Sequence, residues 1–447
     1  MKKKIIYLSI ILVLVISVIT LSSIYKSKDN KYKKEYNTIP KEMAIMIKEE
    51  GATDYTKSTS KEIPKGNYVL NEEKTHCENN GKVTNYDNSS GTVSINFIGS
   101  DRCYLYFDYE VPSRIGYEAI LLDNGGGATT VDAAKAYIEG RTTSTTPDFS
   151  TVATENEGLY AADDDYTATT GMKSYYFRGA VNNNWVKFGK DSSGNDIYWR
   201  IIRINGDGSI RMIYSGTTAP TSSTATVMTG TGTQISTSAF NSSYNNPSYV
   251  GYMYTASQQH GNSTSSMIKT TLENWYKTTT LETDSATKAL VSQDQIFCND
   301  RSVTSGSFST SSTFYYAAYT RLVTNKSPIL TCPTASDKFT SRKSSIGNKA
   351  LDYPVGLITA DEVAMAGGVN GSNNTTYYLY TNQYYWAGSP YYFHSSNTYA
   401  LEFQVLSSGN IGSYRVNNDS GVRGVVSLSS KAKLSGSGTY NDVYTVS

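Results

Sequence analysis

Charged residues are scarce in this sequence of 447 residues, and their scarcity excludes whole classes of partner. Only 18% of the residues are charged, and the segment from Met212 to Ile268 contains no Asp, Glu, Lys or Arg. No basic stripe interleaved with aromatic side chains runs through the body of the chain, so we expect no nucleic-acid partner. The loops are instead rich in Ser, Thr, Asn and Gly, and Tyr outnumbers Phe by 38 to 12. Such an uncharged polar surface is typical of exported proteins that meet sugars or other proteins.

Residues that bind metals are equally few. The chain has three histidines and four cysteines, and it contains no Cys-x-x-Cys motif. We therefore expect no structural zinc site, no other metal and no cofactor. Cys298 has no obvious histidine partner that would make it a catalytic nucleophile, so we expect no catalytic residue. Zinc binding and thiol catalysis remain the alternatives to disulfides.

The cysteines fall into two local pairs, although four cysteines allow three pairings. Cys77 and Cys103 enclose segments whose polar and apolar residues alternate as in strands. Cys298 and Cys332 likewise flank a single insertion. We expect the disulfides Cys77–Cys103 and Cys298–Cys332, which form only in an oxidising compartment outside the cytosol.

A long uncharged run stands near the N-terminus. Residues 5–24 contain no charge, Gly or Pro, and twenty helical residues match the bilayer's hydrocarbon thickness of about 30 Å. The run lacks a small-x-small cleavage site, so we expect an uncleaved signal anchor, with a cleaved signal peptide as the alternative. More lysines follow the run than precede it, which taken alone would place the body inside the cell. The cysteine pairs favour the opposite topology: a single-pass protein of the cell membrane with an extracellular body.

Composition and hydrophobic patterning predict five segments. In chain order they are a cytoplasmic Lys cluster and signal-anchor transmembrane helix (1–24), a juxtamembrane stalk with one short helix from Lys41 to Glu50 (25–64), a small two-cysteine β module (65–112), a connector with one helix capped by Thr130 or Asp132 (113–170), and a large mixed domain (171–447). The overall expectation is therefore an α+β protein.

Turn and cap signals place several elements within the large domain. Asn205-Gly206-Asp207-Gly208 predicts a hairpin turn; a calcium loop is the alternative, but the single carboxylate offers too few ligands. The remaining expectations are an uncharged loop at 217–265, an amphipathic helix with Met267, Thr271, Leu272 and Trp275 on one face, a helix opened by a capping box of Thr359 and Glu362 and ended by Gly367, a hairpin at 399–417, and a last core strand at 421–430.

Several motifs in this order resemble those of a group of exported proteins from low-GC Gram-positive bacteria and their wall-less relatives. They include "YWRIIRINGDGSIRMIY", "YPVGLITADEVAMAGG", "YYWAGSP" and "GVRGVVSLSS". The C-terminal domain of that group is similar to the C-type-lectin-like fold of the formylglycine-generating (sulfatase-modifying) enzymes. The resemblance implies such a fold here, although Gly424 stands where the group usually has Pro, and the calcium-and-sugar motifs of true C-type lectins are absent.

The stretch "TNQYYWAGSPYYFHSSNTY" at residues 381–399 is unusually aromatic. In the resembling group its first half is a core piece, which implies that Trp386 is buried. We expect Trp199 and Trp275 to belong to the same structural core. The second half follows Pro390, so we expect a loop there, and Tyr391, Tyr392 and His394 are the candidate ligand-binding residues; a hydrophobic loop base is the alternative.

These observations predict a membrane-anchored bacterial surface protein that displays a C-type-lectin-like binding domain for adhesion or ligand capture. Its expected partners are the cell membrane, through residues 5–24, and an extracellular glycan or protein. One alternative is an oxidase-type enzyme related to the formylglycine-generating enzymes, which would need a reactive thiol or a metal. The other is a structural subunit of a cell-envelope assembly.

Overall fold

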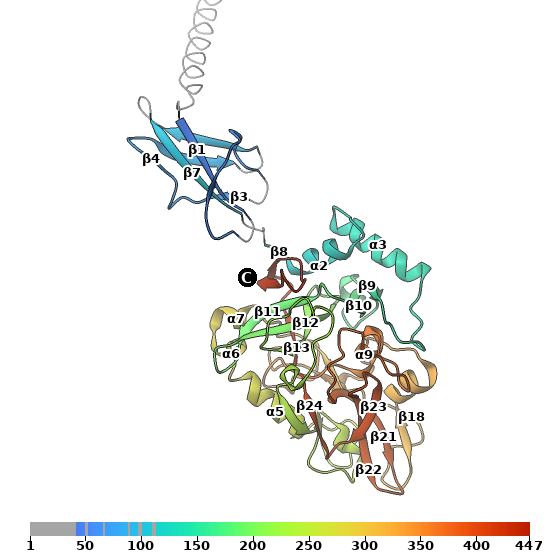
Figure 1. The fold of residues 1–447 in the computed structure, drawn as a ribbon. Coiled ribbons are helices and arrows are strands. Elements are labelled where there is room, and N and C mark those ends of the chain that lie inside the picture. Colours follow the sequence, from blue (N-terminus) through green and yellow to red (C-terminus); the bar gives the residue numbers. More distant parts are fainter. Residues whose placement is uncertain (1–41, 50–51, 66–67, 88–89, 97–100, 110–112) are drawn as a thin grey trace, which may run out of the picture. The chain divides into compact units, whose positions relative to one another are not determined.

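The computed structural model describes residues 42–49, 52–65, 68–87, 90–96, 101–109 and 113–447 of the chain (Figure 1). These residues form two compact units, whose boundary in the sequence lies between Pro112 and Ser113. The boundary falls where the sequence predicts the two-cysteine module to end. The expected membrane span at 5–24 lies outside the described residues, as do residues 25–41 of the expected stalk.

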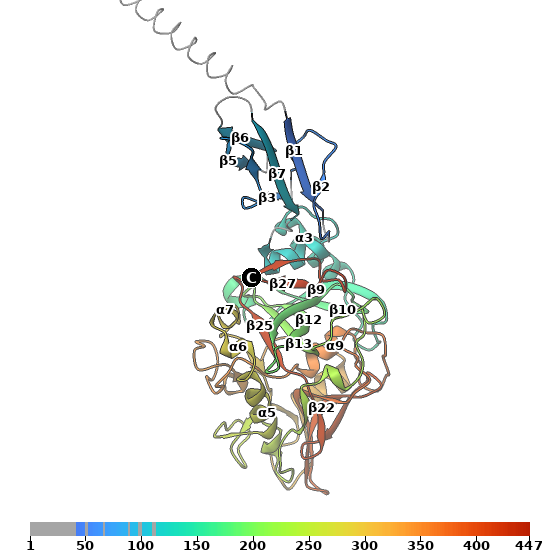
Figure 2. The same ribbon diagram turned by 60° about the vertical axis from the view of Figure 1, so that its left-hand side comes forward.

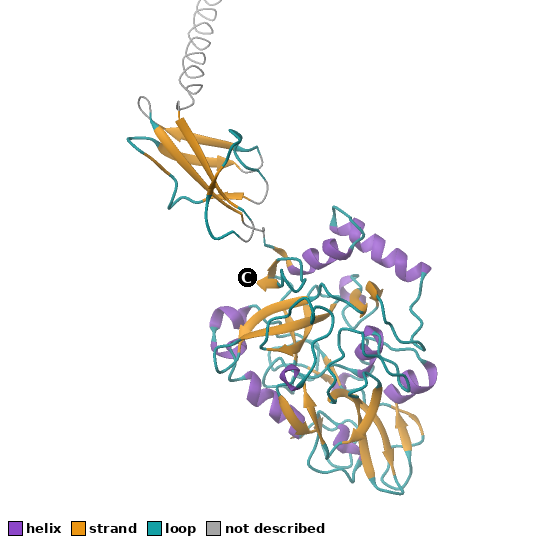
Figure 3. Ribbon diagram, in the orientation of Figure 1, coloured by secondary structure: helices purple, strands orange, loops and turns teal. Residues whose placement is uncertain are grey.

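The first unit is built around one long strand, and its described part consists of strands and loops (Figure 3). Its strands are β1 (Glu42–Lys48), β2 (Thr56–Lys57), β3 (Tyr68–Leu70), β4 (His76–Cys77), β5 (Lys82–Asp87), β6 (Thr92–Asn96) and β7 (Arg102–Tyr109). β7 pairs in parallel with β1 and in antiparallel with β3 and β4, while β5 and β6 form a separate hairpin. Side chains alternate along β7, so Cys103, Leu105 and Phe107 are fully buried.

The helix expected from Lys41 to Glu50 is wrong, because β1 occupies this segment. Ile45 and Ile47 pack with Phe107 in the small core of the unit. A short apolar run fits a helix face or a strand equally well when it is considered locally. The parallel pairing with β7, which lies far downstream, favours the strand. The first unit therefore begins within the expected stalk and not at residue 65.

The second unit, residues 113–447, contains a mixed nine-stranded sheet. Its strands are β8 (Arg114–Ile115), β9 (Asn156–Ala162), β10 (Ser174–Gly179), β11 (Trp185–Lys190), β12 (Asp196–Ile204), β13 (Ile210–Gly216), β25 (Val425–Leu428), β26 (Lys433–Ser435) and β27 (Tyr444–Val446). The main order is β25-β13-β12-β11-β27-β26-β8, and β10 joins β12 to β9. β25, expected to be the last core strand, is thus followed by two more strands, and β27 lies inside the sheet (Figure 2).

A seven-stranded sheet forms the other half of the second unit. Its strands are β14 (Ser236–Ala239), β18 (Val303–Ser305), β19 (Phe314–Tyr316), β21 (Tyr385–His394), β22 (Tyr399–Val405), β23 (Ile411–Arg415) and β24 (Asp419–Val422). The order is β14-β24-β21-β19-β18, with β22 paired to β21 and β23 paired to β22. Two short ribbons pair β15 (Met253–Tyr254) with β16 (Thr264–Ser265) and β17 (Phe297–Cys298) with β20 (Lys338–Phe339). Several of these short elements lie at 217–265, where the sequence predicts only a loop.

Short helices surround the two sheets of the second unit (Figure 3). They are α2 (Gly116–Asn124), α3 (Val131–Ser144), α4 (Thr167–Thr170), α5 (Met267–Tyr276), α6 (Thr280–Thr283), α7 (Ser285–Ala289), α8 (Ala317–Tyr319) and α9 (Ala360–Ala366), with 3₁₀ turns at Thr231–Thr233, Pro247–Val250 and Ala335–Asp337 and a π turn, η3, at Thr320–Asn325. Within the part of the chain that the structure describes, no helix has the length and apolar character needed to cross a bilayer.

Residues 113–170 do not form the separate connector that the sequence predicts. Ile120 of α2 and Ile138 of α3 are fully buried in the core of the second unit. β9 pairs with β10 over most of its length. The predicted cap is confirmed, because the Thr130 side chain accepts a hydrogen bond from the Ala133 N–H at the start of α3. The domain expected to begin at residue 171 therefore begins at Ser113.

The local signals of the large domain are confirmed where chemistry close in sequence decides the structure. β12 and β13 form a hairpin across Asn205–Gly208. The reciprocal capping box of Thr359 and Glu362 opens α9, and Gly367 follows its last residue with φ of 120°. β22 and β23 form the expected second hairpin. Each of these devices needs only residues within a few positions of one another.

The tryptophans expected in the core differ in burial. Trp199 and Trp386 are fully buried. Trp275 is only partly buried and contacts Trp199 edge-on, at 6.3 Å between ring centroids. The inward stripe of α5 consists of Ile268, Leu272 and Tyr276, so Trp275 lies at the edge of this stripe and Met267 is 42% exposed.

Both expected disulfides are present. Cys77 of β4 is bonded to Cys103 of β7, and Cys298 of β17 is bonded to Cys332. These are the four cysteines of the chain, so no free thiol remains. Each bridge closes a loop within a single unit, which restricts the unfolded chain without joining the two units.

Candidate ligand-binding site

The aromatic stretch at 381–399 does not end in the expected loop. β21 continues through Pro390 to His394, with two irregularities of pairing near the proline that let the strand pass it. Tyr391, Tyr392 and His394 are therefore strand residues, each partly buried. Tyr391 contacts the fully buried Phe403 edge-on at 4.7 Å, so it belongs in part to the core.

Strand pairing brings further aromatic rings to these three residues. Phe314 of β19 lies opposite Phe393, and both face inward. Their neighbours Tyr315 and Tyr392 also lie opposite each other, on the other side of the sheet. His394 lies opposite Tyr399 of β22. Side chains alternate between the two faces of a sheet along each strand. The pairing register of β19, β21 and β22 therefore places their aromatic side chains together on one half-exposed surface.

We call this surface the tyrosine face; it consists of Tyr315, Tyr319, Tyr391, Tyr392, His394 and Tyr399. The rings contact one another in an unbroken series. Tyr319 lies 4.4 Å from Tyr315 and 4.9 Å from Tyr391, and Tyr392 lies 5.5 Å from Tyr315. His394 stacks on Tyr399 with 5.0 Å between centroids. Mutual packing holds the rings in place, so the face is preformed before any ligand arrives.

Burial keeps the hydroxyl groups of Tyr319, Tyr391 and Tyr392 protonated over the physiological pH range. Burial, assisted by neighbouring Tyr399, raises the pKa of Tyr392 to about 12. Burial also raises the pKa of Tyr391 and of Tyr319 above the ordinary value. The face therefore presents flat rings and neutral hydroxyl groups, which stack on a ligand and form hydrogen bonds with it.

Sequence reasoning found three of the six residues and missed Tyr315, Tyr319 and Tyr399. The segment "FYYAAYT" at 314–320 carries the same aromatic density as the stretch at 381–399. That density was the available signal for Tyr315 and Tyr319. The pairing of β19 with β21 was not readable, because about 75 residues of sequence separate them.

A second cluster of functional groups is buried and serves the fold. This ionic cluster consists of Asp164, Arg203, Arg211, Asp300, Arg321, Asp361 and Glu362. Arg203 and Arg211 both pair with Glu362, at 3.0 and 2.6 Å, and Arg321 bridges Asp300 and Asp361. Burial opposes ionisation of Glu362, but the two arginines and the Thr359 N–H hold its pKa below the ordinary value.

The ionic cluster lines a cavity of about 20 Å³, which has room for roughly one water molecule. An organic substrate does not fit in such a volume. Cys298 also lines the cavity, and its sulfur is bonded to Cys332. The cluster therefore joins α9 to β12 and β13, and we do not assign it a ligand.

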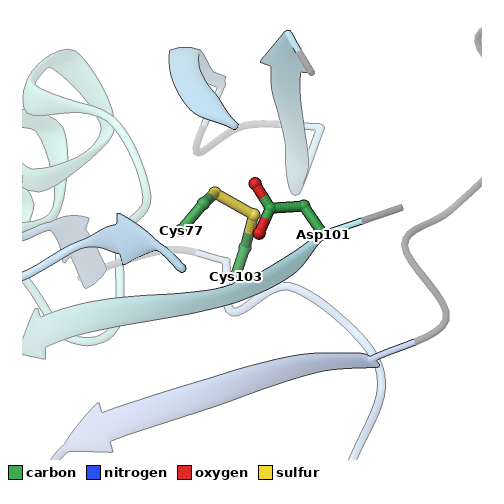
Figure 4. A group of neighbouring side chains, drawn as sticks. All are labelled: Cys77, Asp101 and Cys103. Atoms are coloured by element: carbon green, nitrogen blue, oxygen red, sulfur yellow. A yellow bond between two sulfur atoms is a disulfide. The ribbon is translucent and has the colours of Figure 1, made fainter. Parts of the chain in front are cut away.

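Among the described residues, one group has the composition of a metal site: Cys77, Asp101 and Cys103 (Figure 4). Its two sulfurs are bonded to each other, so they are not thiolate ligands. Asp101 accepts hydrogen bonds from the N–H groups of Asn79, Gly81 and Arg102. Burial acts against these bonds, yet they lower the pKa of Asp101. The carboxylate therefore organises the turn beside the disulfide, and the group does not fit a metal.

Glu402 on β22 is a buried acid that the tyrosine face does not use. It is 0% exposed, and neither carboxylate oxygen has a hydrogen-bond partner among the described residues. Burial raises its pKa well above the ordinary value, and the charge of Arg301 opposes this only in part. Burial therefore favours the protonated form of the Glu402 carboxyl in the folded protein.

We expect Glu402→Gln to stabilise the protein at pH 7 and to have no effect near pH 4. The unfolded chain releases the Glu402 proton above a pKa of about 4.3, whereas the raised pKa of the folded chain retains it to higher pH. The wild type therefore loses stability as the pH rises above that pKa. Glutamine does not titrate, so the Glu402→Gln variant does not lose this stability. Calorimetric melting curves at both pH values measure the effect, with the exposed Glu155→Gln as control. Equal melting temperatures for Glu402→Gln and the wild type at pH 7 would contradict the assignment.

Comparisons of this chain with family models, with curated proteins and with solved structures find no match.

Proposed function

We propose that the chain is a membrane-anchored bacterial surface protein whose second unit, residues 113–447, binds an extracellular glycan for adhesion or capture. On this proposal the unit is a C-type-lectin-like domain, as the sequence resemblance implies, and residues 5–24 hold the chain in the cell membrane. The observation that carries the proposal is the tyrosine face, six contiguous rings that three strands and α8 hold in place. The two disulfides support a location outside the cytosol.

The chemistry of the face suits a sugar. The C–H groups of a pyranose ring pack on the negatively polarised faces of aromatic rings, while its hydroxyls bond to neutral polar groups. Tyrosine offers both at a small cost in side-chain entropy, since it has few rotatable bonds. The alternative of a thiol-dependent enzyme has less support, because all four cysteines are paired and the charged cavity has room for only about one water molecule.

We expect the double variant Tyr315→Ala with Tyr392→Ala to lose glycan binding while it keeps the fold. These two rings are cross-strand neighbours of intermediate exposure, and Tyr391 is left intact because it packs on Phe403. If each ring contact contributes about 1 kcal/mol, the loss of two weakens binding roughly thirtyfold. A glycan array with the full chain in lipid nanodiscs, followed by titration of the hits, measures the change.

The matched control is Tyr384→Ala with Tyr440→Ala, two tyrosines that are 52% and 39% exposed and lie outside the tyrosine face. This control should bind as the wild type does. Unchanged binding by the Tyr315/Tyr392 variant would remove the tyrosine face as the site. A fall in melting temperature as large as the loss of binding would instead identify the rings as core.

A further inference from the structure

Arg415 lies at the end of the tyrosine face, and its guanidinium group is unusual in this protein. Its central carbon lies over the Tyr399 ring, 4.3 Å from the centroid. No hydrogen bond or ion pair joins this guanidinium to another described residue. Every other arginine of the chain donates to an oxygen atom or forms an ion pair. Arg415 is exposed, so its donors are available to a ligand.

The sheet fixes Arg415 against the rest of the face. β22 lies between β21 and β23, and Arg415 of β23 is paired with Leu401 of β22. His394 of β21 and Arg415 therefore approach Tyr399 from strands on opposite sides of β22. A stacked guanidinium is partly immobilised by the ring beneath it, yet its N–H groups still point outward in a planar fork.

No ion pair joins Arg415 to an acid among the described residues, and Asp419, four residues further along the chain, is the acid nearest to it in sequence. None of the six residues of the tyrosine face is an acid, and the turn at 395–398 reads Ser-Ser-Asn-Thr. The parallel N–H groups of an arginine side chain match two oxygens of a carboxylate or sulfate group. Hydrogen bonds between two charged groups are stronger than those between neutral groups. Charge complementarity thus selects an anionic group at this end of the face.

We propose that the ligand of the tyrosine face is an acidic glycan, whose sugar rings stack on the tyrosines and whose carboxylate or sulfate group binds Arg415. This inference rests on the proposed function and adds the class of sugar. A polysaccharide fits better than a nucleic acid, because one cation does not neutralise the regular phosphates of a bound strand.

The test compares two forms of one polymer, so that charge is the only variable. The probes are oligomers of polygalacturonate and the same oligomers after full methyl esterification, titrated onto the full chain in uncharged nanodiscs. Dextran sulfate against dextran forms a second pair for sulfate. We expect the wild type to bind an acidic form about tenfold or more tightly than its neutral partner, since a charge-assisted bond is absent from the ester.

Three variants test whether Arg415 is responsible for the preference for the acidic form. Arg415→Ala should abolish the difference in affinity between the acidic form and its ester. Arg415→Lys should restore part of the difference, because lysine keeps the charge without the fork. Arg342→Ala, which removes an arginine that is 76% exposed and paired with Asp352, should bind as the wild type does.

Equal binding of acidic and neutral forms, with both lost in the Tyr315/Tyr392 double variant, would overturn the acidic ligand and leave the proposed function in place. No binding of either form, or binding that the tyrosine variant does not affect, would overturn the proposed function itself. Tighter binding of single-stranded DNA or of a polyglutamate peptide than of every acidic glycan would also reject the inference.

Discussion

Trp386→Ala is expected to lower the free energy of unfolding of the second unit by about 3–5 kcal/mol, the usual result of deleting a buried tryptophan. Trp386 is fully buried and contacts Phe240 edge-on at 5.8 Å between ring centroids. Its indole N–H also donates to the backbone oxygen of Ser238 at 2.8 Å. The substitution therefore leaves both a cavity and a buried carbonyl without a partner.

Urea titration followed by circular dichroism measures this loss, and Trp386→Phe provides a milder variant if the alanine form does not fold. The control is Trp275→Ala, because Trp275 lies at the edge of the α5 stripe and remains partly exposed. We expect the control to cost clearly less. A similar cost for the two alanine variants would mean that the burial of Trp386 does not determine its contribution.

Glu362→Gln should destabilise the second unit by about 3–5 kcal/mol, because it leaves the buried Arg211 without a counter-charge and leaves the buried Arg203 with Asp164 alone. Arg203 and Arg211 both point at this one carboxylate. Glutamine keeps the shape of the side chain, so the loss reports charge and not packing. The difference from the wild type should shrink in acid, because the lowered pKa of Glu362 means that its stabilising charge is lost as the pH falls.

Asp163→Asn is the matched control for the ionic cluster. Asp163 pairs with Lys173 at 2.9 Å, but both side chains are largely exposed. Exposed pairs contribute about 0–1 kcal/mol, so this variant should melt close to the wild type. If Glu362→Gln behaved like Asp163→Asn in urea titrations, the buried arginines would have to be neutralised by other groups.

What the sequence could predict is what its local chemistry decides. The cap at Thr130, the capping box of α9 and the turn at Asn205–Gly208 all depend on contacts within a few residues. The disulfide pairing was also readable, because each pair encloses one short segment. Such signals act in the same way whatever the tertiary structure, because the residues that interact are always close together in the sequence.

The errors share a different cause, which is pairing between distant segments. β1 became a strand because β7 supplies its partner, and Tyr391–His394 became part of β21 because β19 and β22 flank it. The connector joined the second unit because β9 pairs with β10. Four of the six residues of the tyrosine face lay within the aromatic stretch, but Tyr315 and Tyr319 did not, and Arg415 had no feature that set it apart from other arginines in the sequence. The composition of the aromatic stretch was visible in the sequence, but the pairing register between remote strands was not. The unknown register was therefore the main limit on predicting the site.

The position of β27 has a consequence for the order in which the second unit assembles. β27 lies between β11 and β26, and β26 in turn holds β8, so residues 444–446 connect the start of the unit to the rest of its sheet. Until those residues arrive, the sheet consists of two unconnected pieces, and the closing contacts carry a large loop entropy. In a chain that emerges from its N-terminal end, β8 is therefore joined to the rest of the sheet only after nearly the whole unit has been made. We propose that the protein crosses a membrane before it folds. This delay would then leave the start of the second unit unpaired during translocation.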